Sequence, residues 1–266
     1  MNTDTFNEII WEKARELYRD MPWRDNTDPY YVLVSELMLQ QTQVDRVIPK
    51  FELFMATFPS IKDLALASLA EVLTVWSGLG YNRRAKFLHE AAKKVVTDFE
   101  GSIPGTYDQL VSLPGVGPNT AGAILAYSFN QPVVFIETNV RTVFFHHFFE
   151  DQALVNDKEL KELVAETVDK EHPREWYWAL MDYGSFLKRQ GVGRINKSSH
   201  YKKQAPLSGS LREVRGLILK ALAKGEYSED QLRAEMPADE RYETAIIALM
   251  NEGLVTRTGE RLHLAR

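Results

Sequence analysis

Helical hydrophobic periodicity runs through residues 1–205 and restricts this part of the chain to a mainly α-helical fold. Apolar residues recur at intervals of three or four, as at Phe6, Ile10, Ala14 and Leu17, which is the spacing of one helix face. Proline and glycine separate many of the periodic segments, and two-residue hairpin turns between strand-like runs are missing here. The sequence therefore predicts an all-α body.

The expected helices of the body follow one another through short connections. Their ranges are 6–17, 30–42, 44–58, 61–66, 69–76, 83–99, 107–112, 119–129, 139–149 and 158–168. Pro49 falls inside one of them, and its ring and missing N–H predict a kink or a break there. Residues 133–136 are a short β-branched patch, which we interpret as a buried connection leading into a helix.

A smaller domain is expected after a polar, basic connection at residues 198–210. Helical patterns at 211–223, 228–234 and 240–251 precede residues 254–264, which alternate apolar and polar around a Thr-Gly turn. Three helices and a β-hairpin are typical of a winged helix, and so small a module is expected to dock on the body. We therefore predict a body at 1–205 and a winged-helix-like domain at 206–266.

Composition excludes several classes of protein. The chain has no cysteine, which excludes disulfides, thiol catalysis and thiolate-held iron–sulfur clusters. No apolar run approaches the roughly 18 residues of a membrane span, and the acidic N-terminus lacks a signal-peptide pattern. His146 and His147 lack further ligands at metal spacing, so we expect them to pack in the core and predict no metal site. A cytoplasmic monomer without membrane contact is expected, associated with the nucleoid if the source is bacterial.

Charge is segregated along the chain although the formal net charge is −5. No acidic residue occurs between Asp182 and Glu213. A local concentration of positive charge lets an acidic protein bind a polyanion, whereas the simpler interpretation is a solvated linker. The basic residues expected to contact DNA phosphates are Lys188, Arg189, Lys202 and Lys203.

The sharpest local motif is the run Leu113-Pro114-Gly115-Val116-Gly117 between two helical patterns. Gly115 and Gly117 allow positive φ and leave the backbone uncovered. Their N–H groups and the N-terminus of the next helix can hold an anion such as a DNA phosphate. A monovalent cation at the hairpin is the one cofactor that we leave open. The alternative is a glycine-containing helix connection that binds nothing.

Two carboxylates stand in different settings. Glu36 lies among apolar residues of a helix, and Glu137 lies where a buried patch turns into a helix. Taken alone, Glu36 reads as an exposed helical acid and Glu137 as an N-cap or first-turn acid. Together they suit glycosidic cleavage, in which one acid protonates the leaving group and the other stays ionised beside a developing oxocarbenium ion.

Several motifs occur in order between residues 22 and 184. They are Pro22-Trp23-Arg24, the run from Ser35 to Val44, Trp76-Ser77-Gly78-Leu79-Gly80-Tyr81, the run from Leu113 to Gly122, Thr138-Asn139-Val140-Arg141 and Met181-Asp182-Tyr183-Gly184. Together they resemble the MutY adenine DNA glycosylases of the helix–hairpin–helix superfamily. The resemblance implies a bilobal fold, with one lobe at 23–132 and the other from 1–22 plus 133–205, and DNA in the cleft between them.

The resemblance also implies an activity, namely flipping a base out of a duplex that contains a mismatch or lesion and hydrolysing its glycosidic bond. Glu36 matches the acid that protonates the adenine, and Asn139 matches a polar active-site residue. Gln40, Gln41 and Tyr81 match residues that fill or wedge the DNA stack. Their alternatives are a solvated helix end for the two glutamines and a core position for Tyr81.

Four departures from the family pattern limit what the resemblance implies. Glu137 stands where the family has Asp, and Asn119 stands where bifunctional relatives place a nucleophilic Lys. Because an amide cannot form a Schiff base, Asn119 favours a glycosylase without lyase activity. The iron–sulfur loop is replaced by the basic segment, and the family's C-terminal domain, which reads 8-oxoguanine, is replaced by the winged-helix-like domain. Two alternatives therefore stay open: a glycosylase that excises another mismatched or damaged base, and a DNA-binding protein without catalytic activity.

Overall fold

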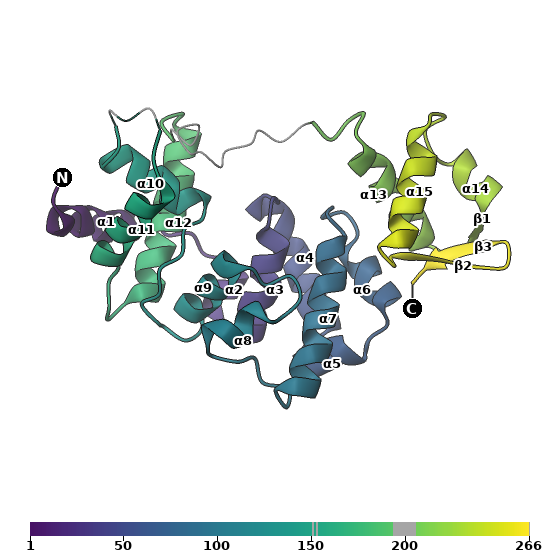
Figure 1. Cartoon of the computed structure of the whole chain (residues 1–266), viewed down its shortest axis with the longest axis horizontal. Helices are drawn as coiled ribbons and strands as arrows, with labels where there is room; N and C mark the ends of the chain where they lie inside the picture. Colours follow the sequence, from purple (N-terminus) through teal and green to yellow (C-terminus); the bar gives the residue numbers. More distant parts are fainter. Residues whose placement is uncertain (151, 153, 194–205, 266) are drawn as a thin grey trace. The chain divides into compact units, whose positions relative to one another are not determined.

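The computed structural model describes residues 1–150, 152, 154–193 and 206–265, and it confirms a mainly helical chain with a small C-terminal sheet (Figure 1). The described residues form two compact units. Unit 1 comprises 1–33, 105–111 and 116–203, and unit 2 comprises 34–104, 112–115 and 204–266. The helix α3 (Pro29–Leu39) passes from unit 1 into unit 2.

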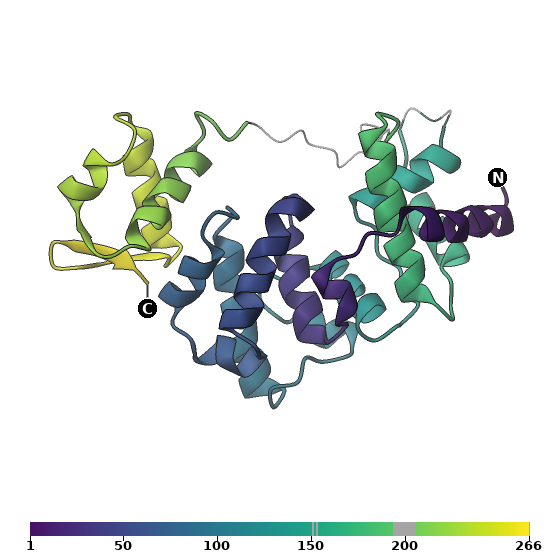
Figure 2. The same cartoon turned by 180° about the vertical axis from the view of Figure 1, so that it is seen from behind.

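Unit 1 is built around the long helix α12 (Pro173–Arg189), which packs against both α1 and α10 (Figure 2). Aromatic side chains fill this contact, with the Phe6 and Phe144 ring centroids 4.9 Å apart and Trp176 against Phe144. The other helices of the unit are α1 (Thr3–Leu17), α2 (Pro22–Asp25), α8 (Tyr107–Val111), α9 (Pro118–Tyr127), α10 (Thr138–His147) and α11 (Asp157–Thr167).

A buried ion pair joins α2 to α12 inside unit 1. The guanidinium of Arg24 donates to both carboxylate oxygens of Asp182 at 2.7 and 3.0 Å, and both side chains are only 2% exposed. Arg19 donates to the same carboxylate from its Nε at 2.7 Å. Because a buried carboxylate requires such partners, the Pro-Trp-Arg and Met-Asp-Tyr-Gly motifs have a shared structural role.

Unit 2 combines a helical part with the C-terminal domain. Its elements are α4 (Val44–Thr57), α5 (Ile61–Leu66), α6 (Leu69–Trp76), α7 (Arg83–Asp98), α13 (Leu211–Leu222), β1 (Tyr227–Ser228), α14 (Glu229–Ala234), α15 (Arg241–Asn251), β2 (Val255–Thr258) and β3 (Arg261–Leu264). The three C-terminal helices and the hairpin occur as predicted, and β1 adds an unpredicted strand to an antiparallel sheet of order β1-β3-β2. The hairpin register pairs Val255 with Leu264 and Thr258 with Arg261.

The structure differs from the sequence predictions in three respects. Helix α4 runs without a break through Pro49, because the missing N–H removes one hydrogen bond while Val47 and Phe51 stay buried. Helices α2 and α12 have no counterpart among the predicted ranges. The compact units also differ from the predicted lobes in their bounds. Residues 116–132 belong to unit 1, where α9 packs against α12, although the sequence predicts them in the first lobe. Residues 206–265 belong to unit 2, together with most of that first lobe.

The buried side chain of Arg84 fastens the end of α3 to the loop before α7. Its Nη1 donates to the carbonyl oxygens of Leu37, Met38 and Gln40 at 2.6 to 2.8 Å. Its Nη2 donates to the Thr42 hydroxyl and to the Gly80 carbonyl, both at 3.1 Å. Burial lowers the pKa of Arg84 to about 10, so the guanidinium stays charged at neutral pH.

We expect Arg84→Met to lower the free energy of unfolding by about 3 kcal/mol, because it leaves several buried carbonyl groups without a donor. For a chain of this size that loss corresponds to a fall in Tm of roughly 6 to 12 °C. The matched control is Arg83→Met, since Arg83 is exposed and contacts only the Phe87 ring among the interactions described for it. Equal melting temperatures for the two variants would contradict the role given to Arg84.

Candidate functional site

The carboxylate of Glu137 is fixed at the N-terminus of α10, and the predicted N-cap is confirmed. Its Oε1 accepts hydrogen bonds from the backbone N–H groups of Asn139 and Val140, the latter at 3.0 Å. Its Oε2 accepts a longer bond of 3.3 Å from the Asn139 side-chain amide. Glu137 is only partly buried, so one carboxylate oxygen is committed to the cap while the other keeps capacity to accept.

Opposing influences act on the charge of Glu137. Burial raises the pKa of Glu137, while the positive charge of Lys188 and the N–H donors of Asn139 and Val140 lower it. Burial in turn lowers the pKa of Lys188, and the negative charge of Glu137 raises it. The α10 N-terminus and Lys188 on α12 therefore favour the ionised carboxylate that burial disfavours.

Asn119 and Asn139 lie close to this carboxylate in unit 1. The Asn119 Nδ2 donates to the Ile136 carbonyl at 2.9 Å, and the Ile136 N–H donates back to the Asn119 Oδ1 at 3.4 Å. Asn119 thus fixes the residue that precedes Glu137. The Oδ1 of Asn139 is buried and has no hydrogen-bond partner among the described residues, which leaves an acceptor beside the carboxylate.

A glycine on α12 allows this close packing. A Cβ on Gly184 would lie 2.6 Å from both the Cβ and the carbonyl oxygen of Asn139, so only glycine lets α12 approach α10 here. On the preceding turn, Met181 contacts the Asn139 amide through its sulfur at 3.7 Å. Lys188 follows Gly184 by one helical turn and therefore lies on the same face of α12.

Several candidate residues of unit 2 line a cavity of about 910 Å³. Gln40, Gln41 and Tyr81 line it, together with the glycines that precede Tyr81. Gln41 has φ of 56° and Tyr81 has φ of 47°, a left-handed conformation that is unfavourable for such side chains and often marks functional sites. Glu36 is partly buried on α3, one turn before Gln40.

The glycine motif forms a tight turn between α8 and α9. Gly115 has φ of 78°, and a Cβ there would lie 2.8 Å from the Cβ of Phe87. Gly117 is the N-cap of α9 and has nothing within 4 Å of a Cβ position, so this helix end is uncovered. Leu113 is only 2% exposed because its side chain packs in the core, and its role as a DNA contact stays a prediction.

The basic segment is described only in part. Lys188 and Arg189 lie in the last turn of α12, whereas Lys202 and Lys203 lie outside the described residues. His147 bonds the Tyr183 hydroxyl at 3.0 Å, and burial lowers its pKa to about 4, as expected for a packed neutral histidine. No group of metal-binding side chains occurs among the residues that the structure describes.

Comparison with known proteins gives the family. Residues 34–170 match the family described as HhH-GPD superfamily base excision DNA repair protein. An adenine DNA glycosylase of Mycobacterium tuberculosis is 32% identical over 277 aligned positions, covering 95% of this chain and 90% of that protein. The chain therefore belongs to the HhH-GPD superfamily.

Two further relatives define the extent of the similarity. An adenine DNA glycosylase of Buchnera aphidicola (subsp. Baizongia pistaciae) is 35% identical over 173 residues, which cover 64% of this chain. The chain spans about half the length of that relative, with 48% covered. The solved structure of a thermostable thymine-DNA glycosylase is 25% identical with a TM-score of 0.64, covering 73% of this chain and 94% of that one.

Among the described residues, none of the helices has the length and apolar character needed to cross a membrane.

We expect Lys188→Met to raise the pKa of Glu137, because it removes a positive charge that favours the carboxylate. The pKa can be followed by NMR through the side-chain carboxyl carbon of Glu137 during a pH titration. Arg189→Met is the matched control, since Arg189 is not among the groups that shift Glu137. A Glu137 titration that is the same in both variants would show that Lys188 does not act on this carboxylate.

Proposed function

We propose that the chain is a DNA glycosylase that flips adenine out of a mismatched duplex and hydrolyses its N-glycosidic bond without lyase activity. The observation that carries the proposal is the Glu137 carboxylate, held at the α10 N-terminus beside the Asn139 amide and within the field of Lys188. The membership of the HhH-GPD superfamily and the adenine DNA glycosylases among its relatives support the choice of reaction and base.

In this reaction the two carboxylates have different tasks. Glu36 donates a proton to the adenine, so that the base leaves as a neutral molecule. Ionised Glu137 stabilises the positive charge that develops on the sugar and orients the attacking water. Water supplies the hydroxyl that replaces the base at C1′, and the proton it loses passes to solvent. Products are free adenine and an abasic site.

The extra methylene of Glu137 is compatible with this task. A glutamate reaches further from the backbone than the aspartate of the family pattern, yet its Oε1 still accepts both N–H groups of the cap. The cap holds the longer side chain in one orientation, and Oε2 accepts only the long bond from Asn139 among the described contacts. We propose that Oε2 is the oxygen that faces the sugar.

The duplex would be bound through its phosphates. The uncovered N-terminus of α9 at Gly117 is suited to a phosphate, and Lys188 and Arg189 add positive charge at the end of α12. Because Asn119 has no amine, the product is expected to keep an intact abasic site. We propose an enzyme that acts without a cofactor, as a monomer, in the compartment that holds the DNA, with at most a monovalent cation at the hairpin.

A second candidate function is excision of thymine from a mismatch. It is favoured by one observation, the likeness in sequence and fold to a thermostable thymine-DNA glycosylase. The departures at Glu137 and Asn119 from the adenine-specific pattern are equally compatible with it.

The experiment that tests the proposal measures single-turnover excision, with excess enzyme, from duplexes that contain one target each. The targets are adenine opposite 8-oxoguanine, guanine or cytosine, and thymine or uracil opposite guanine. We expect release of adenine, and a loss of roughly 100-fold or more in Glu36→Gln, which keeps shape but removes the proton. Glu52→Gln, an exposed glutamate of α4, is the matched control.

Each alternative has its own outcome in this panel. Release of thymine or uracil instead of adenine would establish the second candidate. Binding of mismatched duplex without release of any base would establish a protein that has lost catalysis. Near-normal excision by Glu36→Gln would contradict the role of Glu36, and a covalent adduct trapped by borohydride would contradict the absence of lyase activity.

Substitutions of Glu137 separate its charge from its cap. Glu137→Gln keeps an oxygen that can accept the α10 N–H groups but removes the charge, so we expect most excision to be lost with little change in Tm. Glu137→Asp should retain part of the activity, because aspartate restores the family pattern. Glu137→Ala should also lose about 1 kcal/mol of stability with the cap. Normal excision by Glu137→Ala would reduce this residue to a cap.

A further inference from the structure

Two arginines from different parts of unit 2 lie near the ring of Tyr81. The guanidinium of Arg84 on α7 is 5.5 Å from the Tyr81 ring centroid, and that of Arg212 on α13 is 5.4 Å from it. Arg212 also donates a hydrogen bond from Nη1 to the Tyr81 hydroxyl. The C-terminal domain thus contacts the one aromatic residue that the resemblance assigns to the DNA stack.

The contact between Arg212 and Tyr81 lies at the cavity of unit 2. Tyr81 and Arg212 both line the cavity of about 910 Å³, and Gln40 and Gln41 line it with them. The left-handed backbone of Tyr81 fixes the direction of its Cα–Cβ bond, but the ring can still rotate about its side-chain bonds. A donor at the hydroxyl, the far end of the ring, restricts that remaining freedom.

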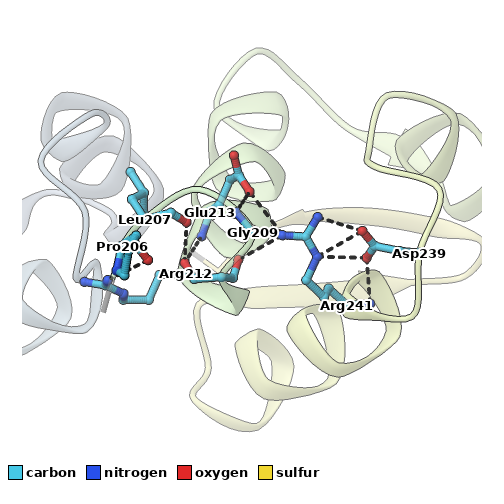
Figure 3. A network of polar contacts seen from close by, with 8 residues as sticks. Pro206, Leu207, Gly209, Arg212, Glu213, Asp239 and Arg241 are labelled. Atoms are coloured by element: carbon cyan, nitrogen blue, oxygen red, sulfur yellow. Dashed lines mark hydrogen bonds and ion pairs between the residues drawn. The ribbon is translucent and has the colours of Figure 1, made fainter. Parts of the chain in front are cut away.

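Arg212 is itself held in place by the first turn of α13 (Figure 3). Ser210 caps this helix by accepting from the Glu213 N–H, and the Glu213 carboxylate accepts from the Gly209 N–H at 2.9 Å. Arg241 of α15 binds the same carboxylate at 3.1 Å, and Asp239 in turn binds Arg241. These contacts hold the backbone at the start of α13, and Arg212 reaches Tyr81 from this first turn.

A second contact anchors the C-terminal domain on α7. The Lys86 Nζ donates to the Glu252 carbonyl oxygen at 2.6 Å, and the Glu252 carboxylate binds Arg215 of α13 at 2.6 Å. Helix α13 is therefore tied to α7 through Glu252 as well as to Tyr81 through Arg212. Two separate contacts determine where Arg212 lies relative to Tyr81.

Helix α15, the last helix before the hairpin, is poorly suited to binding DNA phosphates. It is flanked by Glu240 and Glu252 and carries Glu243 in its first turn. Its arginine, Arg241, is paired with Asp239 and Glu213. An acidic helix would repel the phosphates. The face of the domain that carries Arg212 is therefore better suited to act on DNA than α15.

We propose that Arg212 is a positioning residue for Tyr81: it holds the ring by its hydroxyl in the orientation that enters the DNA stack beside the target nucleotide. This inference rests on the proposed function and assigns the C-terminal domain a role in base flipping through Tyr81. Because the ring is held before DNA arrives, less side-chain freedom is lost when it is inserted.

A double-mutant cycle tests the proposal. The variants are Arg212→Ala, Tyr81→Phe, which keeps the ring and removes the hydroxyl, and the combination of the two. Single-turnover excision at saturating enzyme is measured for each, together with affinity for mismatched and matched duplexes and unfolding in urea. Lys224→Ala, an exposed residue of the same domain, controls for loss of one positive charge.

We expect each single substitution to lower the excision rate about 10-fold, and the double variant to lose no more than either single variant, because both remove the same contact. Affinity for the matched duplex should not change. Losses that multiply in the double variant would overturn the proposal, since Arg212 would then act independently of the Tyr81 hydroxyl. Wild-type excision in Arg212→Ala would overturn it as well.

Failure of the proposed function gives a different result. If the wild-type chain excises no base from the panel, the proposed function fails, and the cycle is then decided by preference for mismatched over matched duplex. A preference lost equally in the single and double variants would still support positioning of Tyr81 by Arg212. The positioning role would be overturned if Arg212→Ala kept the preference for mismatched duplex, or if the losses of the two single variants multiplied in the double variant.

Discussion

The hydrogen bonds between the Glu137 carboxylate and the first N–H groups of α10 are the interaction on which the proposed site depends. They place a negative charge at a helix end that favours it, which is a stable arrangement in any helical protein. In this chain the surrounding packing is built around that end. Gly184 lets α12 approach Asn139 closely, Asn119 fixes the residue before Glu137, and Lys188 adds positive charge nearby.

Much of the helical framework could be predicted from the sequence, because it follows from local rules. Apolar spacing gave the course of α4 to α7 and of α13 to α15, and the Thr-Gly turn gave the hairpin. Pro49 shows the limit of a local rule, since buried neighbours on α4 outweigh one lost hydrogen bond. The N-cap at Glu137 could also be predicted from the sequence, because an acid directly before a helical pattern is an N-cap signal.

The arginine contacts could not be predicted, because they connect residues far apart in the sequence. Arg84 binds carbonyl groups of residues 44 to 47 positions earlier in the sequence, and Arg24 pairs with Asp182, 158 positions later. The sequence does not distinguish an arginine that is buried and hydrogen-bonded from one that is exposed, such as Arg83. The burial of Leu113 could not be predicted for a related reason, since its place in a glycine-containing motif does not reveal that its side chain packs in the core. Arg212 joins this group, because its contact with Tyr81 connects residues 131 positions apart in the sequence.

We propose that Glu36 and Glu137 act on the same nucleotide. A crystal structure of the protein on a duplex with a non-hydrolysable adenine nucleotide tests this most directly. We expect the Glu36 carboxyl within hydrogen-bond distance of an adenine ring nitrogen, and the Glu137 Oε2 facing C1′ of the same nucleotide. A flipped adenine whose sugar lies away from the α10 N-terminus, with Glu137 bonded only to its own helix, would contradict the account.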